Sequence, residues 1–352
     1  MTIVSADLGY GYVKVIASNG ERAIFPSVVG DGVNNVDLTN TFGQRNNDIN
    51  NMHLKMNNES YFIGELAEKE SSSSTRIFEK ERFSNNHTKI LLNTAIQLVS
   101  DSDIVKIATG LPLDYYQSQS KSFRESILGI HPVTTWVSGP LAGQEKTINI
   151  DNALVLPQGA TALFTALVNH EGKFVYPHLM TEGNLIALID IGFRTTDYIV
   201  VEIQSNGSFS PIAKLSGSVD AGVINLHNSL HQAFKSKTGG SDLNQRYIKQ
   251  ILKNGHLLFK GEKIDFKETI KFSKESIVSN ISDRLKSIWS NEADLFGAIF
   301  LAGGGGELFQ PDIQPYFDNR LQLIYESQFA NAIGALRLSR ATFAAKKGKK
   351  LG

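Results

Sequence analysis

The sequence predicts an α/β protein built from two related halves, and three observations support this fold class. Two short aspartate–glycine loops, at residues 7–14 and 190–197, each follow an apolar run and lead into a run rich in β-branched residues. Glycine permits the backbone angles that such strand–turn–strand units need. A run of four glycines at 303–306 follows a third apolar segment. Between these motifs, β-rich stretches and segments of helical periodicity alternate twice, which is the pattern of two α/β domains.

The composition narrows the class of protein further. A chain of 352 residues is long enough for two domains. Lys+Arg and Asp+Glu both total 35, so the zero net charge gives no argument for nucleic acid or a membrane surface as an obligatory partner. The absence of cysteine excludes disulfides, thiolate catalysis and cysteine-based zinc sites. No signal segment or long apolar window is present, so we expect a soluble cytoplasmic protein without membrane contact.

Turn and capping residues set the expected elements of the first half. Asn19-Gly20 suits a type I′ turn between two strands, and Asn85 or Asn86 is the expected cap of a helix. Pro157 suits the first turn of a helix, where its missing N–H costs no internal bond. The expected order is strands over 3–30, a mostly irregular segment with at most one weak strand over 31–60, renewed order over 59–67, a flexible loop at 71–74, a helix over 86–99, a strand over 104–108, a helix over 117–130, a hairpin over 134–150, a short strand over 153–156 and a helix over 157–169.

The second half repeats this alternation of strands and helices. Apolar residues at helical spacing fall on one side of the segment 267–289, which predicts a long amphipathic helix there. Two glycines at 239–240 follow the helix expected over 223–234 and mark its end. The expected order is a strand over 185–189, β structure to about 215, a helix over 223–234, a short helix and a charged hairpin within 243–266, the long helix, a strand over 298–302, a helix starting near 307 and a last helix over 329–338.

Asp7 and Asp190 are the candidate metal ligands. An aspartate is a poor ligand for bare phosphate but suits a magnesium ion that carries phosphates. The carboxyl end of a parallel strand is where α/β sheets bind ligands, and Lys14 could reach the phosphates as a point charge. Either loop alone could be an ordinary Asp-Gly turn, but the occurrence of both between strands favours a functional interpretation. Two such loops facing each other would hold a nucleoside triphosphate between two halves of the protein.

Two further motifs carry weaker signals. The glycines at 303–306 lack Cβ atoms and would let a nucleoside or phosphate lie against the backbone; the alternative is a flexible turn. Gln158 could orient a water molecule without acting as a strong base; the alternative is an ordinary polar residue at a helix start. The eight histidines show no metal-ligand spacing, and His227 with His231 is the only pair at helical spacing.

Five segments occur in the order typical of the actin-type ATPase superfamily, which includes actin, heat-shock chaperone ATPases and sugar kinases. They resemble its first phosphate loop, first connecting helix, second phosphate loop, adenosine motif and second connecting helix: residues 7–14, 155–160, 190–197, 301–306 and 330–335. This resemblance implies an actin-like ATPase fold, with two related ribonuclease H-like α/β domains around a nucleotide cleft. Domain I would comprise residues 1–157 with 330–352, and domain II residues 158–329.

Within that superfamily, the chain is most similar to prokaryotic actin-like proteins of the ParM/StbA group, including their archaeal relatives. The similarity rests on Gly9-Tyr10-Gly11, on residues 25–27, 61–65 and 109–113, and on the loop at 190–197. Such proteins polymerise with ATP into filaments, and the plasmid members push DNA copies apart. The resemblance therefore implies ATP or alternatively GTP, Mg²⁺, self-association into filaments and a DNA-binding adaptor, without direct sequence-specific DNA binding.

The same resemblance assigns roles to individual residues. Asp7 and Asp190 would hold Mg²⁺ through waters, and Gln158 would position the attacking water, so Gln158 and Asp190 are the expected catalytic residues. The expected phosphate contacts are Gly9, Tyr10, Gly11 and Lys14, with Gly192 and Thr195 from the second loop, and the expected adenosine contacts are Gly303, Gly304 and Gly305. Two positions depart from the wider family. Tyr10 stands where actin has a small hydroxyl residue, so its side chain should turn away, and Gln158 stands where some plasmid relatives carry glutamate.

Three other functions remain on the same fold. A sugar or acetate kinase would need a catalytic base facing the γ-phosphate, and no residue stands out for that task. A chaperone-like ATPase would need a substrate-binding domain, which is not expected after residue 345. A membrane-tethered division actin would need an amphipathic terminal helix, and residues 337–350 contain few large apolar side chains. A filament-forming ATPase is therefore the first hypothesis.

Overall fold

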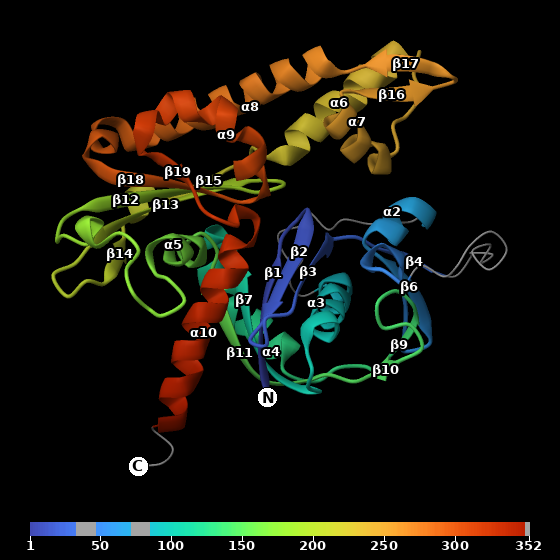
Figure 1. The fold of residues 1–352 in the computed structure, drawn as a ribbon, viewed down its shortest axis with the longest axis horizontal. Coiled ribbons are helices and arrows are strands. Elements are labelled where there is room, and N and C mark those ends of the chain that lie inside the picture. Colours follow the sequence, from blue (N-terminus) through green and yellow to red (C-terminus); the bar gives the residue numbers. More distant parts are fainter. Residues whose placement is uncertain (33–46, 72–84, 349–352) are drawn as a thin grey trace. The chain divides into compact units, whose positions relative to one another are not determined.

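The computed structural model describes residues 1–32, 47–71 and 85–348. The chain separates into two compact units (Figure 1): unit 1 comprises Met1–Thr161 and Asn331–Gly352, and unit 2 comprises Ala162–Ala330. Among the described residues, no helix has both the length and the apolar character needed to cross a membrane. The loop expected at 71–74 lies, beyond Ser71, outside the described residues.

The main sheet of unit 1 brings three strand ends together. Its order is β3 (Arg22–Pro26), β2 (Tyr12–Ala17), β1 (Thr2–Leu8), β7 (Ile104–Leu111), β11 (Asn149–Pro157) and β8 (Gly129–Ile130). β1, β7 and β11 run parallel, whereas β2, β3 and β8 are antiparallel to their neighbours. The carboxyl ends of the three parallel strands therefore meet at one edge of the sheet, which is where α/β sheets place their sites.

Three helices pack on this sheet. α3 (Asn86–Val99) contacts β1 and β2, and Asn85 caps it by accepting a hydrogen bond from the backbone N–H of His87, so the expected helix and its cap are confirmed. α4 (Leu113–Ile127) contacts β11 and begins directly after Pro112, earlier than expected. α10 (Ala330–Gly348) adds buried Ala332, Ala335 and Phe343 to unit 1.

The second sheet of unit 1 contains a hairpin that begins in the asparagine-rich segment. Its order is β10 (Glu145–Lys146), β9 (Thr134–Ser138), β5 (Met52–Met56), β6 (Glu59–Ile63) and β4 (Val29–Asp31), followed in the chain by α2 (Glu65–Glu70). β6 lies where order was expected to return, and β5 lies in the segment expected to be mostly irregular with one weak strand, of which residues 33–46 are outside the described residues. Asn57 and Asn58 have φ values of 50° and 65°, as a type I′ turn requires. The alternation of buried Met52, Leu54 and Met56 is the sequence signal that places β5.

The type I′ turn expected at Asn19-Gly20 was wrong. The loop between β2 and β3 has four residues, and of these only Gly20 has a positive φ, at 96°. The backbone N–H of Ala17 donates to the carbonyl of Glu21, and the side chain of Asn19 accepts from the N–H of Glu21. The asparagine therefore acts through its side chain in this turn, as Asn commonly does.

The sheet of unit 2 has the strand order of the first sheet. The order is β14 (Phe209–Pro211), β13 (Thr196–Ile203), β12 (Leu185–Ile191), β18 (Phe296–Ala302) and β19 (Leu321–Leu323), with β15 (Gly217–Val219) pairing β13. β12, β18 and β19 are parallel, as β1, β7 and β11 are in unit 1. The prediction of two related α/β halves is confirmed by this repeated topology.

The helices of unit 2 occur in the predicted order, but the expected helix start at Pro157 was wrong, because Pro157 ends β11 and the helix that follows begins at Ala160. The helices are α5 (Ala160–Leu167, whose first two residues belong to unit 1), α6 (Val223–Lys237), α7 (Ile248–Asn254), α8 (Lys267–Trp289) and α9 (Gly304–Phe317). α8 has the predicted bounds, and the charged hairpin is present as β16 (His256–Phe259) and β17 (Glu262–Asp265). Short 3-10 turns lie at Ile49–Asn51, Pro177–Leu179, Ala213–Leu215, Gln245–Tyr247, Ser290–Leu295, Asp318–Arg320 and Ser327–Phe329.

Each unit buries one tryptophan whose indole N–H has a partner. In unit 1, Trp136 Nε1 donates to Gln97 Oε1 at 2.6 Å, and Gln97 Nε2 donates to Thr134 Oγ1 at 3.0 Å. In unit 2, Trp289 Nε1 donates to the carbonyl of Leu215 at 3.0 Å. A buried polar group needs such a partner because leaving it unsatisfied costs desolvation energy.

Replacing Gln97 by Met tests this network. The change keeps the volume but leaves the Trp136 N–H without its acceptor, so we expect the free energy of unfolding to fall by about 1–3 kcal/mol. The matched control is Gln117→Met on the exposed side of α4, which should stay within about 0.5 kcal/mol of the parent. Equal denaturant midpoints for the two variants would contradict the proposed role of Gln97.

Candidate functional site

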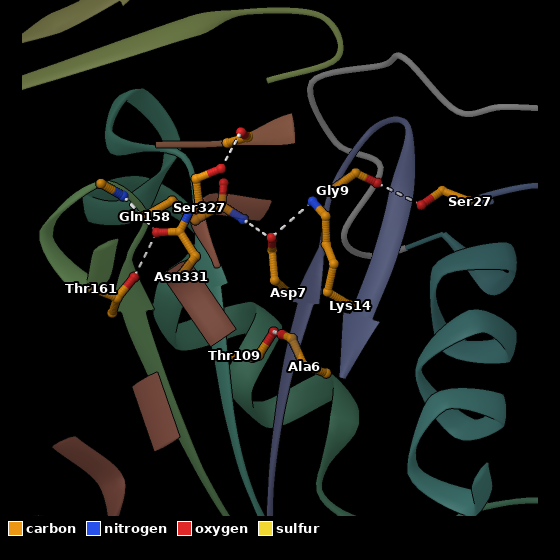
Figure 2. A network of polar contacts seen from close by, with 12 residues as sticks. Ala6, Asp7, Gly9, Lys14, Ser27, Thr109, Gln158, Thr161, Ser327 and Asn331 are labelled. Atoms are coloured by element: carbon orange, nitrogen blue, oxygen red, sulfur yellow. Dashed lines mark hydrogen bonds and ion pairs between the residues drawn. The ribbon is translucent and has the colours of Figure 1, made fainter. Parts of the chain in front are cut away.

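The first group of candidate residues, which we call the first half-site, surrounds Asp7 in unit 1 (Figure 2). Asp7 lies near the carboxyl end of β1 and is only 6% exposed. Lys14 is its direct cross-strand neighbour on β2, with Nζ 3.1 Å from Asp7 Oδ2. Gln158 Nε2 donates to Asp7 Oδ1 at 2.8 Å. A buried carboxylate requires such charge-assisted hydrogen bonds to offset its lost hydration.

Gln158 is held between the end of β11 and the start of α5. Its backbone N–H donates to the carbonyl of Leu111 at 2.8 Å, and the residue is 9% exposed. The start of α5 is fixed by Asn331, whose Oδ1 accepts from the Gly159 N–H at 3.0 Å and from Thr161 Oγ1 at 2.8 Å (Figure 2). Asn331 was part of a recognised motif, but nothing in the sequence assigned it this contact.

The loop Gly9–Gly11 is anchored by Ser27. Ser27 Oγ donates to the carbonyl of Gly9 at 2.7 Å (Figure 2), and the Ser27 N–H donates to the carbonyl of Gly11 at 2.9 Å. A Cβ at Gly9 would lie 2.8 Å from the Tyr12 carbonyl oxygen and 2.9 Å from Lys14 Nζ. Close packing therefore requires glycine at position 9. The carbonyls of Gly9 and Gly11 both accept hydrogen bonds from Ser27.

The second half-site surrounds Asp190 in unit 2. Asp190 is 7% exposed and lies in β12, directly opposite Asp197 of β13. The Gly192 N–H donates to the carbonyl of Thr195 at 2.9 Å and closes the loop between the two strands. The carbonyls of Gly192 and Phe193 accept from the first amides of α6, at Val223 and Ile224, so this loop caps that helix.

The glycine run is the start of a helix in this structure. α9 begins at Gly304, so Gly304, Gly305 and Gly306 form its first turn and Gly303 is its cap, with φ at 85°. A Cβ at Gly303 would lie 2.3 Å from the Ile191 carbonyl oxygen and 2.4 Å from Asp190 Oδ1. The helix start expected near residue 307 therefore lies three residues earlier, because the glycines permit close contact with the second aspartate loop.

The structure thus gathers the candidate residues in two sets. Asp7, Lys14, Gln158 and the first glycine loop lie together in unit 1, and Asp190, Gly192, Thr195 and Gly303–Gly305 lie in unit 2. Tyr10 is half-buried. Gly110 and Ser27 belong to the first set, although sequence reasoning gave them no role.

The carboxylate oxygens of Asp7 could accept hydrogen bonds from the waters of a hydrated magnesium ion. Each Asp7 oxygen accepts one hydrogen bond from the protein side chains named above, and a carboxylate oxygen can accept two. Each oxygen therefore keeps capacity for a metal-bound water, the mode by which Mg²⁺ usually meets protein. Within the part of the chain that the structure describes, no group of three or more His, Cys, Asp or Glu could hold a metal by itself.

Two family models match consecutive parts of this chain. Residues 5–160 match the family described as actin like proteins N terminal domain, and residues 188–315 match archaeal actin homologue MreB-like, C-terminal. An archaeal actin homolog of Thermoplasma acidophilum is 25% identical over 346 residues, covering 95% of this chain and 97% of the relative.

Two solved structures share the fold over nearly the whole chain. A 15-stranded ParM filament from Clostridium botulinum has a TM-score of 0.86 and 29% identity, covering 97% of this chain and 99% of that chain. An archaeal actin homolog solved in complex with ADP has a TM-score of 0.77 and 20% identity, covering 97% and 100%.

The two domains have mixed sheets of the same strand order, and in each sheet one strand leads into an aspartate–glycine loop. This arrangement defines an actin-like α/β fold. The two family matches follow one another along the chain, and the similarity to actin homologs extends over almost all of it. The chain is a prokaryotic actin-like protein.

Gly303→Ala tests how the second half-site is built. We expect the free energy of unfolding to fall by at least about 1 kcal/mol from the left-handed backbone alone, with a further loss as Asp190 and Ile191 are displaced. Gly304→Ala is the matched control, because the atoms nearest to its Cβ would all belong to the Gln328 side chain, at 3.3 Å or more. Equal unfolding midpoints for the two variants would show that the close contact at Gly303 is unimportant.

Proposed function

We propose that this protein is an ATPase that binds Mg-ATP through both half-sites and assembles into filaments with the nucleotide. The observation that carries the proposal is repetition. Asp7 and Asp190 are both buried, and they occupy equivalent ends of β1 and β12 in two sheets of the same order. Each aspartate is followed by a tight glycine loop, and a phosphate chain with its metal is the ligand class that such a pair suits.

The residues divide the work of binding. The proposed phosphate contacts are Gly9, Tyr10, Gly11 and Lys14 from the first half-site and Gly192 and Thr195 from the second. Gly303, Gly304 and Gly305 would lie against adenine and ribose, since they present backbone without Cβ atoms. Asp7 and Asp190 would hold hydrated Mg²⁺, which supplies positive charge beside the phosphates. ATP is the first candidate nucleotide and GTP the alternative.

Hydrolysis in this proposal depends on position more than on basicity. Phosphoryl transfer leaves little covalent chemistry for the protein, so orienting the attacking water is the main task of a polar side chain. Gln158 is buried and fixed against Asp7, which suits a group that orients a water molecule. Asp190 would contribute through the metal ion that it holds.

Filament assembly would depend on whether ATP or its hydrolysis product is bound. A ligand that contacts two parts of a protein favours the conformation in which both contacts are made, and loss of the γ-phosphate removes part of that preference. The ParM filament with 29% identity supports self-association as the property controlled here. Segregation of plasmid DNA in the cytoplasm, through a DNA-binding adaptor, is the most specific form of the proposal.

Light scattering and sedimentation test assembly directly. Purified protein with Mg-ATP should form sedimentable polymer above a critical concentration, and the polymer should decay as ATP is consumed, because hydrolysis removes the γ-phosphate contact. Protein without nucleotide is the control and should stay in the supernatant. If ATP is turned over while no polymer forms at any concentration, an enzyme such as a kinase of the same superfamily becomes the better proposal.

Two substitutions test the division of roles. Asp190→Ala should abolish hydrolysis, because the metal loses a proposed ligand. Gln158→Ala should slow hydrolysis on the order of 10²-fold while leaving ATP-dependent assembly intact, since only the water loses its orientation. Asp151→Ala and Gln117→Ala, at exposed positions, are the matched controls. Normal hydrolysis by Gln158→Ala would show that another group positions the water.

A further inference from the structure

We propose that Gly110 and Asp7 are positioning residues, which together fix the side chain of Gln158 in the orientation that hydrolysis needs. The inference rests on the proposed function, because it concerns how Gln158 meets its water. Gly110 belongs to β7 and is the direct neighbour of Leu156 on β11, two residues before Gln158. Asp7 approaches the same side chain from β1.

Gly110 provides the space that the Gln158 side chain fills. A Cβ at position 110 would lie 2.8 Å from Gln158 Cγ, 3.6 Å from its Cδ and 3.5 Å from its Nε2. These three atoms are the nearest neighbours, and Gly110 does not have the positive φ that would itself require glycine. Carbon atoms pack at about 3.5–4.0 Å, so an alanine here would displace Gln158 in particular.

Asp7 fixes the orientation of the Gln158 side-chain amide. An ionised carboxylate only accepts hydrogen bonds, and an amide has one donating and one accepting end. The contact of 2.8 Å with Asp7 Oδ1 therefore belongs to Nε2, and Oε1 is directed elsewhere. Lys14 is donor-only and binds the other Asp7 oxygen, which keeps the carboxylate turned toward Gln158. The carbonyl oxygen Oε1 is the group that can accept a hydrogen bond from a water molecule.

The surroundings leave Gln158 little room to adjust on the side of Asn331. The space bounded by Ser5, Asp7, Gln158, Thr161 and Asn331 is too small to admit a water molecule. A side chain pushed away by a larger residue at 110 has no cavity there to enter, so we expect the displacement to disturb its contact with Asp7. The steric constraint from Gly110 and the polar contact with Asp7 thus act on the same side chain, and Figure 2 shows the polar contact.

The test compares four proteins: the parent, Gly110→Ala, Gln158→Ala and the double variant. We expect Gly110→Ala to slow single-turnover ATP hydrolysis on the order of 10²-fold, as Gln158→Ala does, while ATP affinity stays within about twofold. In the Gln158→Ala background, Gly110→Ala should cause no further loss, because alanine at 158 has no Cγ to displace. Normal hydrolysis by Gly110→Ala, or the same loss in both backgrounds, would overturn the role of Gly110.

Stability gives a second readout of the same contact. If the clash destabilises Gly110→Ala, the double variant should recover part of the lost unfolding midpoint, since the clashing atom is gone. No recovery would show that position 110 acts on something other than Gln158. If the parent protein binds ATP but does not hydrolyse it, the proposed ATPase function and this inference both fail. If the parent hydrolyses and Gly110→Ala does too, only this inference fails.

A double-mutant cycle that combines Asp7→Asn with Gln158→Ala tests the hydrogen bond between Asp7 and Gln158. Lys14 would draw the new amide oxygen toward itself, so the amide nitrogen would face Gln158 and force its amide to reverse. We expect Asp7→Asn to slow hydrolysis at saturating Mg-ATP by a larger factor in the parent than in the Gln158→Ala background. The same factor in both backgrounds would mean that Asp7 acts only through the metal and would overturn its positioning role.

Discussion

The buried carboxylate of Asp7 is the constraint around which the first half-site is organised. An ionised group with 6% exposure must find hydrogen-bond donors within the protein, and Lys14 and Gln158 are the side chains seen to supply them. Satisfying Asp7 therefore also fixes the position of a lysine and the orientation of a glutamine. Gly110 and Leu111 of β7 complete this arrangement, because one leaves space for Gln158 and the other accepts its backbone N–H.

The two half-sites share a topology but differ in charge. In both, the aspartate ends a central strand and a glycine loop leads into the antiparallel neighbour. The residue opposite Asp7 is Lys14, whereas the residue opposite Asp190 is Asp197. The two aspartates therefore have different cross-strand neighbours, a lysine beside Asp7 and a second acidic residue beside Asp190.

Local sequence signals predicted the elements, and distant contacts decided the site. Helix α8 follows from its periodicity and could be predicted with its bounds, whereas the hairpin β16–β17 could be predicted only as part of the segment 243–266. Strand β6 falls in the stretch where order was expected, whereas β5 could not be placed because its alternation is short and lies in an asparagine-rich segment. The contact between Gly110 and Gln158 joins residues far apart in the chain, and no local pattern contains it. The glycine run was recognised, but its role as a helix start depends on the neighbouring strand β12.

In the proposed function, one nucleotide engages both aspartate loops. Hydrogen exchange of the backbone amides in residues 7–11 and 190–195, measured while Mg-ATP is titrated, is the decisive experiment. Both loops should gain protection together, over the same range of nucleotide concentration. Protection of one loop while the other exchanges as in the free protein would contradict this proposal.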